Sequence, residues 1–209
     1  MTNSHKKTLF SHDLPATPMD PALQASRDQK IKVAMIGLCG CWGCTLSLLD
    51  MDEALIGLLD KVTILRSSLT DIKRIRQRCA IGFIEGGVAN EENIETLKEY
   101  REHCDILISV GACAIWGGVP AMRNEVELSS CLEEAYVDSI TAVANAIPTI
   151  PYHEDIPRIT TKVYPCHEVV KMDYFIPGCP PDGGTILKVL DDLVNGREFD
   201  LPTTMNRYD

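Results

Sequence analysis

Hydrophobic and polar positions follow two alternating patterns along most of this chain. Short runs of apolar and β-branched residues are typical of strands that are buried on both faces of a sheet. Between them lie longer stretches in which apolar residues recur at helical spacing. The predicted strands are residues 31–38, 62–65, 80–85, 105–110 and 174–176. The predicted helices are residues 45–59, a short one capped at 70–71 and ending near 77, 91–103, 128–146 and 182–195.

Capping residues and prolines set the ends of several of these helices. Asn90 is a good N-cap for the helix that follows it, and Pro148 stops the helix before it. Gly196 suits the left-handed conformation that commonly ends a helix. The proline-rich stretch 150–164 is predicted to be irregular.

The alternation of strands and helices predicts an α/β fold, a doubly wound and mostly parallel sheet with helices on both faces. The chain of 209 residues is long enough for one such domain, which we place at residues 31–209. Residues 1–30 show neither the helical nor the strand pattern of apolar residues, and they contain three prolines. We expect them to form an N-terminal arm that is flexible or docks on a partner.

Composition and charge narrow the function classes. Hydrophobic residues make up 45% and charged residues 24% of the chain, as in ordinary globular proteins. The net charge of −10 argues against non-specific binding to nucleic acid or anionic lipid. No apolar run approaches the roughly 20 residues of a membrane helix, and neither a secretory signal nor an Arg-Arg pair is present. We therefore expect a cytoplasmic protein.

Nine cysteines are many for such a chain, and their odd number suits a disulfide framework poorly. Disulfides are rare in the cytoplasm, so metal binding or redox chemistry is the favoured explanation. Three cysteine-bearing loops each follow a predicted strand, at residues 38–44, 111–114 and 177–181. Ligands of open α/β sheets bind at the carboxyl ends of strands. We therefore expect these loops to meet and to hold one iron–sulfur cluster.

The Cys41–Cys44 pair, with its C-x-x-C spacing, admits three interpretations. A thioredoxin-type redox pair at a helix start would leave Cys113 and Cys179 unexplained. A structural zinc site usually has two close pairs of cysteines, and only one is present here. An iron–sulfur cluster accepts ligands from separate loops, and glycines beside each cysteine let backbone amides approach the sulfides. The cluster is the preferred interpretation.

The remaining cysteines are given lesser roles. Cys39 is an alternative to Cys41 as the first ligand, but the C-x-x-C spacing favours Cys41. Cys166 is a candidate ligand or near neighbour of the cluster, thirteen residues before Cys179. Three others are expected to be buried thiols that pack as small hydrophobes: Cys79, Cys104 and Cys131.

Four motifs together carry a resemblance to a known family: C-W-G-C at 41–44, I-E-G-G at 84–87, G-A-C-A-I-W-G-G at 111–118 and P-G-C-P-P at 177–181. In this order they resemble the small subunits of [NiFe] hydrogenases. The similarity is closest to the soluble, bidirectional, NAD-reducing type and covers about residues 31–195. The set of motifs is highly specific, whereas any one of them alone is not.

The resemblance implies a flavodoxin-like domain that holds the proximal [4Fe-4S] cluster on Cys41, Cys44, Cys113 and Cys179. It also implies a large subunit that carries the catalytic Ni–Fe centre, so no catalytic residue is expected on this chain. Electrons from H2 would pass through the cluster to diaphorase subunits, with flavin and iron–sulfur clusters of their own, which reduce NAD+. Glu85 would lie near the large subunit, or else serve as a helix-start or surface carboxylate.

Several departures from the family pattern refine this expectation. About thirty residues follow Cys179 and none is cysteine, so a single cluster is expected where many members hold more. Gly43 and Gly118 stand where oxygen-tolerant members are expected to have extra cysteines, which predicts an ordinary four-cysteine cubane. Gly40 stands where many members have Glu, which puts a local proton role in doubt. The chain also lacks the twin-arginine leader of exported members.

Two further features concern the surroundings of the cluster. Trp42 and Trp116 flank ligands and either shield the cluster from water or take part in ordinary core or interface packing. The glycine pairs at 86–87 and 117–118 could approach an FMN, which loops of such sheets often bind. No G-x-G-x-x-G phosphate-binding signature supports the FMN.

Three other functions compete with this prediction. The cluster-bearing subunit of NADH:quinone oxidoreductases shares the G-x-C and P-G-C-P-P loops but usually has adjacent cysteines in place of C-x-x-C. Small subunits of F420- or ferredoxin-linked hydrogenases differ mainly in the chains that accept the electrons. A binding or scaffold module with structural zinc is the alternative from another class, and iron with labile sulfide would reject it.

Overall fold

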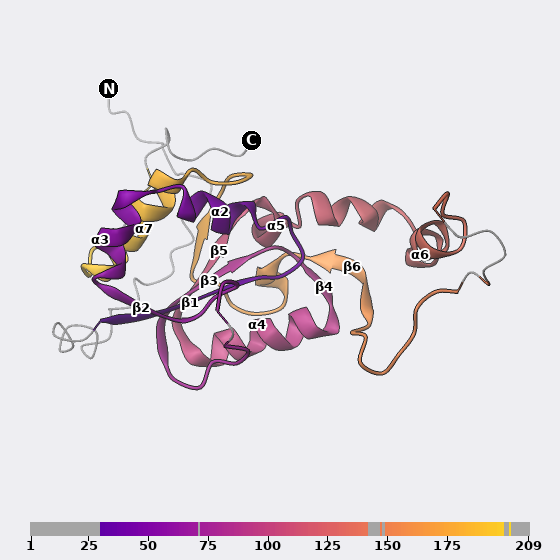
Figure 1. The fold of residues 1–209 in the computed structure, drawn as a ribbon, viewed down its shortest axis with the longest axis horizontal. Helices are drawn as coiled ribbons and strands as arrows, with labels where there is room; N and C mark the ends of the chain where they lie inside the picture. Colours follow the sequence, from indigo (N-terminus) through magenta and orange to yellow (C-terminus); the bar gives the residue numbers. More distant parts are fainter. Residues whose placement is uncertain (1–29, 71, 142–146, 148, 199–200, 202–209) are drawn as a thin grey trace, which may run out of the picture.

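A five-stranded parallel sheet forms the centre of the computed structural model, which describes residues 30–70, 72–141, 147, 149–198 and 201 (Figure 1). The strand order is β2-β1-β3-β5-β7, and every neighbouring pair is parallel. The strands are β1 (Ile31–Gly37), β2 (Val62–Arg66), β3 (Cys79–Glu85), β5 (Cys104–Val110) and β7 (Tyr174–Ile176). The predicted α/β fold with a parallel sheet is confirmed. The predicted arm lies outside the described residues, apart from Lys30.

Helices cover both faces of this sheet (Figure 1). One face carries α2 (Gly43–Leu49), α3 (Glu53–Leu59) and α7 (Gly183–Val194), and the other carries α4 (Glu91–His103). The remaining elements are α5 (Gly111–Trp116), α6 (Leu128–Tyr136), the 3-10 helices η1 (Val119–Glu125) and η2 (Cys166–Glu168), and the antiparallel pair β4 (Val88–Asn90) and β6 (Ile159–Tyr164). No helix in the described part of the chain is long and apolar enough to cross a membrane.

Two hydrophobic clusters lie on the two sides of the sheet. Successive side chains of a strand point to opposite faces, so Phe83 joins one cluster and Ile84 the other. Val189 of α7 belongs to the first cluster, whereas Leu97 and Tyr100 of α4 belong to the second. Burial on both faces explains why the central strands are continuous apolar runs.

Helix α4 has the bounds that the sequence predicts. The Asn90 side chain accepts a hydrogen bond from the Asn93 amide at 2.8 Å, as an N-cap should. Glu91 and Glu92 lie in the first turn and Arg101 in the last, which complements the helix dipole. Helix α7 likewise begins beyond the cap Asp182 and ends before Gly196, whose φ is +69°.

The predicted single helix 45–59 is wrong, because the chain breaks it into α2 and α3 at residues 50–52. Asp52 takes a φ of +48°, which ends any helix. The break accompanies a close approach of α7: a Cβ on Gly183 would lie 2.9 Å from Cγ of Met51 and 2.5 Å from the Ser47 carbonyl oxygen. Tertiary packing therefore overrides the helical period here.

The predicted short helix before Gln77 is also wrong among the described residues, since 72–78 form an irregular segment. Its middle residue, Ile75, is buried in the α4-side cluster. The Ile75 amide donates a hydrogen bond at 2.9 Å to Oε1 of Glu99 on α4. The Glu99 side chain on α4 thus accepts the hydrogen bond that this amide would have donated within a local helix.

The region from 128 to 164 differs from its prediction at both ends. Helix α6 ends at Tyr136 and buries none of its residues, so Cys131 is half-buried and not the core thiol expected. Residues 142–146 and 148, where the predicted helix ends, lie outside the described residues. Residues 159–164, expected to be irregular, form β6 and pair with β4.

The α4-side cluster can be tested at Leu97, which is fully buried. Leu97→Ala is expected to lower the free energy of unfolding by about 2–5 kcal/mol, because it removes apolar contacts and leaves a cavity. Glu95→Ala, an exposed position on the same helix, is the control and should change it by less than about 0.5 kcal/mol. Chemical denaturation of the purified protein measures both. Equal stability of the two variants would contradict this assignment of the core.

Candidate iron–sulfur site

The segments that follow β1, β5 and β7 carry the four candidate ligands at the carboxyl edge of the sheet: Cys44 lies in α2, Cys113 lies in α5, and Cys41 and Cys179 lie in loops. Backbone hydrogen bonds hold these segments in place. The Ala112 amide donates to the Gly178 carbonyl at 2.8 Å, which joins the loops of Cys113 and Cys179. Cys39 and Gly87 exchange two bonds, at 2.9 and 2.8 Å, which join the first loop to the end of β3.

Cys113 lies within electrostatic reach of the other three candidate thiols. Burial raises the pKa of the Cys44 thiol well above its ordinary value, and the charges of Glu85, Cys113 and Cys41 raise it further. Burial also raises the pKa of Cys113, with contributions from the charges of Cys179 and Cys41. Four thiolates at this place would repel one another. A positively charged metal centre would supply the compensating charge.

Glycines stand directly against three of these sulfurs. A Cβ on Gly111 would overlap Sγ of Cys44, and one on Gly118 would lie 2.9 Å from Sγ of Cys113. A Cβ on Gly43 would lie 3.2 Å from Sγ of Cys41. Gly111 and Gly118 also have positive φ angles of +82° and +49°. The backbone therefore passes close to the thiol groups at these glycines. Cysteine thiolates are the ligands that hold iron–sulfur clusters.

The P-G-C-P-P loop is held from two sides. Ser47 of α2 donates a hydrogen bond at 2.6 Å to the Pro181 carbonyl, and Gly178 accepts the bond from Ala112. Gly178 has a φ of +139°, and a Cβ there would lie 2.5 Å from Cα of Pro181. The Cys179–Pro180 bond is cis. Cys179 is thus exposed at the surface on a loop whose backbone is fixed.

Glu85 lies at the end of β3 and is only 5% exposed, so it is not a surface carboxylate. It accepts hydrogen bonds from the Thr45 amide at 3.1 Å and from the Thr45 hydroxyl at 2.6 Å. Glu85 therefore caps the first turn of α2 from another element, beside Cys44. The prediction did not single out Thr45, whose only sequence signal is a hydroxyl in the first turn after the C-x-x-C pair.

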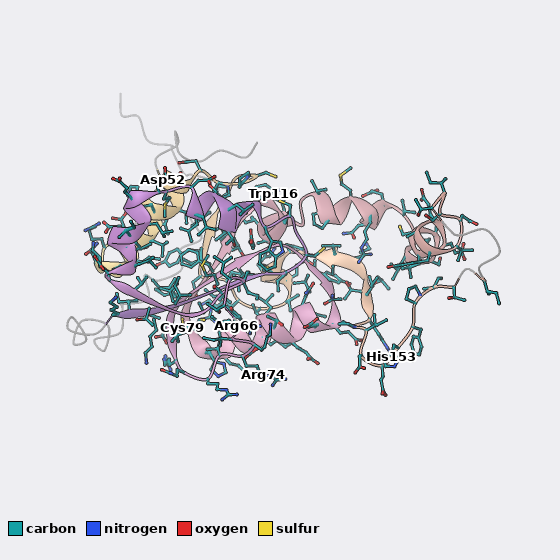
Figure 2. All side chains as sticks on the ribbon, in the orientation of Figure 1. Asp52, Arg66, Arg74, Cys79, Trp116 and His153 are labelled. Carbon is teal, nitrogen blue, oxygen red and sulfur yellow. The ribbon has the colours of Figure 1, made fainter. Side chains whose placement is uncertain are left out.

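The two tryptophans stand at the surface of the site. Trp42 is 38% and Trp116 is 43% exposed, which rules out ordinary core packing for both. The Trp42 ring packs on the end of β1, where a Cβ on Gly37 would lie 3.0 Å from it. Figure 2 shows Trp116 at the same side of the molecule as α2 and α5. Neighbouring segments add further exposed apolar side chains: Leu46, Val119 and Met122.

The other cysteines fall into two groups. The charge of Cys39 contributes to the raised pKa of Cys113, so Cys39 lies near that candidate ligand. Cys166 is fully buried behind the Gly86 loop, its thiol 3.5 Å from the Gly86 carbonyl, and burial raises its pKa to about 12. Cys79 and Cys104 are core thiols that pair at the amino ends of β3 and β5, at the edge of the sheet away from the candidate ligands. No group of three His, Cys, Asp or Glu suited to a single metal ion occurs among the described residues.

The glycine pairs considered for FMN are filled by the chain itself. A Cβ on Gly86 would lie 2.9 Å from the Cys39 backbone, and the amide and carbonyl of Gly87 are both paired with Cys39. A Cβ on Gly117 would lie 2.6 Å from Cβ of Ala121. These glycines therefore serve close packing between segments.

Comparison with known proteins identifies the family. The family model described as "NADH ubiquinone oxidoreductase, 20 Kd subunit" matches residues 41–193, which include all four candidate ligands. The "NAD-reducing hydrogenase HoxS subunit delta" of Cupriavidus necator is 76% identical over the full length of both chains. One chain of the F420-non-reducing hydrogenase of Methanothermobacter marburgensis is 38% identical over 84% of this chain, which spans 57% of that relative.

Solved structures show the same fold. A crystal structure of an NAD+-reducing [NiFe]-hydrogenase in the H2-reduced state contains a chain that is 41% identical, with a TM-score of 0.83. The match covers 87% of this chain and 100% of that one. A [NiFeSe] hydrogenase from Desulfovibrio vulgaris Hildenborough, at 18% identity and a TM-score of 0.50 over 80% of this chain and 63% of that one, shares the fold alone.

The family model alone does not separate hydrogenases from quinone-linked complexes, whereas the full-length relative and the structure at 41% identity do. The C-x-x-C pair at Cys41 and Cys44, which favours a hydrogenase over a quinone-linked complex, agrees with these two matches. The chain belongs to the 20 kDa NADH:ubiquinone oxidoreductase subunit family and, within it, to the small subunits of NAD-reducing [NiFe] hydrogenases.

Proposed function

We propose that this chain carries one [4Fe-4S] cluster on Cys41, Cys44, Cys113 and Cys179. It would link the Ni–Fe centre of a large subunit to NAD-binding diaphorase subunits in the reaction H2 + NAD+ = NADH + H+. The observation that supports this most is the approach of four thiols on three segments linked by hydrogen bonds, three of the sulfurs directly against a glycine. When bound, the cluster supplies one-electron transfer.

The protein residues hold and tune this site. Cys44 and Cys113 are half-buried, and burial disfavours additional charge on whatever they ligate. Glu85 fixes the start of α2 through Thr45 and so positions Cys44 on that helix. Both oxygens of Glu85 accept hydrogen bonds from Thr45, so the carboxyl group is held in place beside Cys44.

The cluster face is defined by the exposed apolar side chains on the segments next to these ligands: Trp42, Leu46, Trp116, Val119 and Met122. Groups of exposed apolar side chains mark protein interfaces. We assign this face to the large subunit, which would also exclude water from the cluster. FMN is left out of the proposal, since the Gly87 amide and carbonyl are already paired with Cys39.

Serine variants of Cys113 or Cys179 test the ligand set. Each is expected to reduce the iron and labile sulfide content sharply and to abolish H2-dependent NAD+ reduction, because serine is a poor replacement for a thiolate ligand. Cys131→Ala, on α6, is the matched control and should keep both. Iron, sulfide and nickel analysis of the anaerobically purified complex makes the measurement.

The same analysis has outcomes that would reject the proposal. Retention of the cluster in either serine variant would remove that residue from the ligand set. Zinc without sulfide in the wild-type protein would indicate a structural metal instead. Iron and sulfide without nickel, together with quinone-linked NADH oxidation, would place the chain in the other branch of its family.

Glu85→Gln tests the electrostatic part of the proposal. Loss of one negative charge beside Cys44 should raise the midpoint potential of the cluster by roughly 40 mV, the equivalent of about 1 kcal/mol for a one-electron couple. The iron content should remain unchanged. Glu95→Gln, on the exposed face of α4, is the control and should leave the potential as it is. Redox titration followed by electron paramagnetic resonance measures both, and an unchanged potential in Glu85→Gln would contradict this role.

Leu46→Glu tests the cluster face. A charge placed on this exposed apolar position should weaken the association with the large subunit, so that less of it co-purifies, while the cluster persists. Ile56→Glu, on α3, introduces the same charge at a similarly exposed position and should have little effect. If the large subunit is lost equally from both variants, the face is misplaced.

A further inference from the structure

One exposed basic segment has no part in the proposed electron transfer. Residues 72–78, which we call the basic strip, have the sequence Ile-Lys-Arg-Ile-Arg-Gln-Arg in a chain whose net charge is −10. All of them except Ile75 are exposed. The strip connects the end of β2 to the start of β3 and takes the place of a crossover helix.

Three of the four cations of the strip lack partners among the described residues. Other basic side chains of the chain form ion pairs, such as Lys61 with Asp191 and Arg101 with Asp173. Within the strip only Arg78 is paired, with Asp105. Lys73, Arg74 and Arg76 make no ion pair or hydrogen bond with any residue that the structure describes. Their charge is therefore available to another molecule.

The backbone of the strip is nevertheless held in place. Ile75 is 4% exposed, and its amide donates to Glu99. Gln77 accepts a hydrogen bond from Lys32 at 2.9 Å. Because its middle and its C-terminal end are anchored, the strip presents its cations from a partly fixed backbone, which lowers the entropy lost on binding.

The strip lies apart from the cluster face. In Figure 2, Arg74 points away from the body on the α4 side of the sheet, whereas Trp116 lies on the opposite side. Two exposed apolar side chains accompany the cations: Leu69, at 69% exposure, precedes the strip, and Ile72, at 47%, begins it. Arginines beside exposed aliphatic residues are typical of protein interfaces.

We propose that the basic strip docks on an acidic protein surface, carried by a subunit of the same complex other than the one that covers the cluster face. This inference rests on the proposed function, because it requires that the chain is part of that complex. The excess negative charge of the rest of the chain would repel a nucleic acid or an anionic membrane, whereas an acidic protein patch can be matched locally. The strip would orient this partner during assembly.

Zero-length cross-linking of the holoenzyme gives a direct test. A carbodiimide joins an amine to a carboxylate that lies in contact with it, so Lys73 should become linked to an Asp or Glu of a partner subunit. Mass spectrometry of the digested complex identifies both ends of the link. Links from Lys73 to its own chain alone, to the large subunit alone, or no link at all would overturn the proposal.

Charge reversal gives an independent measurement. In the purified holoenzyme, Arg74→Glu/Arg76→Glu should speed the dissociation of one subunit about tenfold and reduce its salt dependence, since attraction becomes repulsion. Arg158→Glu/Lys162→Glu is the matched control, because it makes the same charge change at exposed cations that also lack side-chain partners among the described residues. Native mass spectrometry at low and high salt counts the subunits.

Every other outcome counts against the strip. Equal effects of the two double variants would indicate a general charge effect. The wild-type protein could instead bind RNA or phosphatidylserine vesicles. If the strip variant loses that binding, the strip belongs to a different class of partner. Iron and sulfide content is expected to be unchanged in both variants. Failure of the docking proposal therefore leaves the cluster assignment intact, and the two failures can be told apart.

Discussion

The close approach of three backbone loops at one edge of the sheet is the constraint on which the rest of the site depends. Ala112 donates to Gly178, which joins the segments of Cys113 and Cys179, and Ser47 of α2 donates to the Pro181 carbonyl, which joins the segment of Cys44 to that of Cys179. A side chain at Gly111 or Gly178 would collide with this arrangement. The parallel strands bring their carboxyl ends to the same edge, and these bonds then fix the loops that carry the thiols.

The parts of the molecule that could be predicted from sequence are those with local signals. The central strands are apolar runs because they are buried on both faces, and α4 has a cap and oppositely charged end turns. The candidate ligands could be grouped because each cysteine loop directly follows a strand, and the sheet brings strand ends together. Sequence pattern and topology thus point to the same edge without any information on distances.

The parts that could not be predicted depend on contacts between distant segments. The break at Asp52 accompanies the approach of Gly183 to Ser47 and Met51, more than a hundred residues away along the chain. Residues 72–78 leave the helical pattern because Glu99 takes the amide of Ile75. The pair formed by Glu85 and Thr45 is of the same kind, since forty residues separate its members.

Glu85 and the cations of the basic strip have different roles, because they differ in burial and in distance from the candidate ligands. Glu85 is buried beside Cys44, where exclusion of water strengthens its influence on the charge of the site. The cations of the basic strip are exposed on the other side of the molecule, and salt screens exposed charges beyond about 10 Å. The strip can therefore influence which protein docks and how fast, but it contributes little to the potential of the cluster. An acidic chain with an apolar face and a basic strip on opposite sides presents two chemically different surfaces, so two partners can bind without competing.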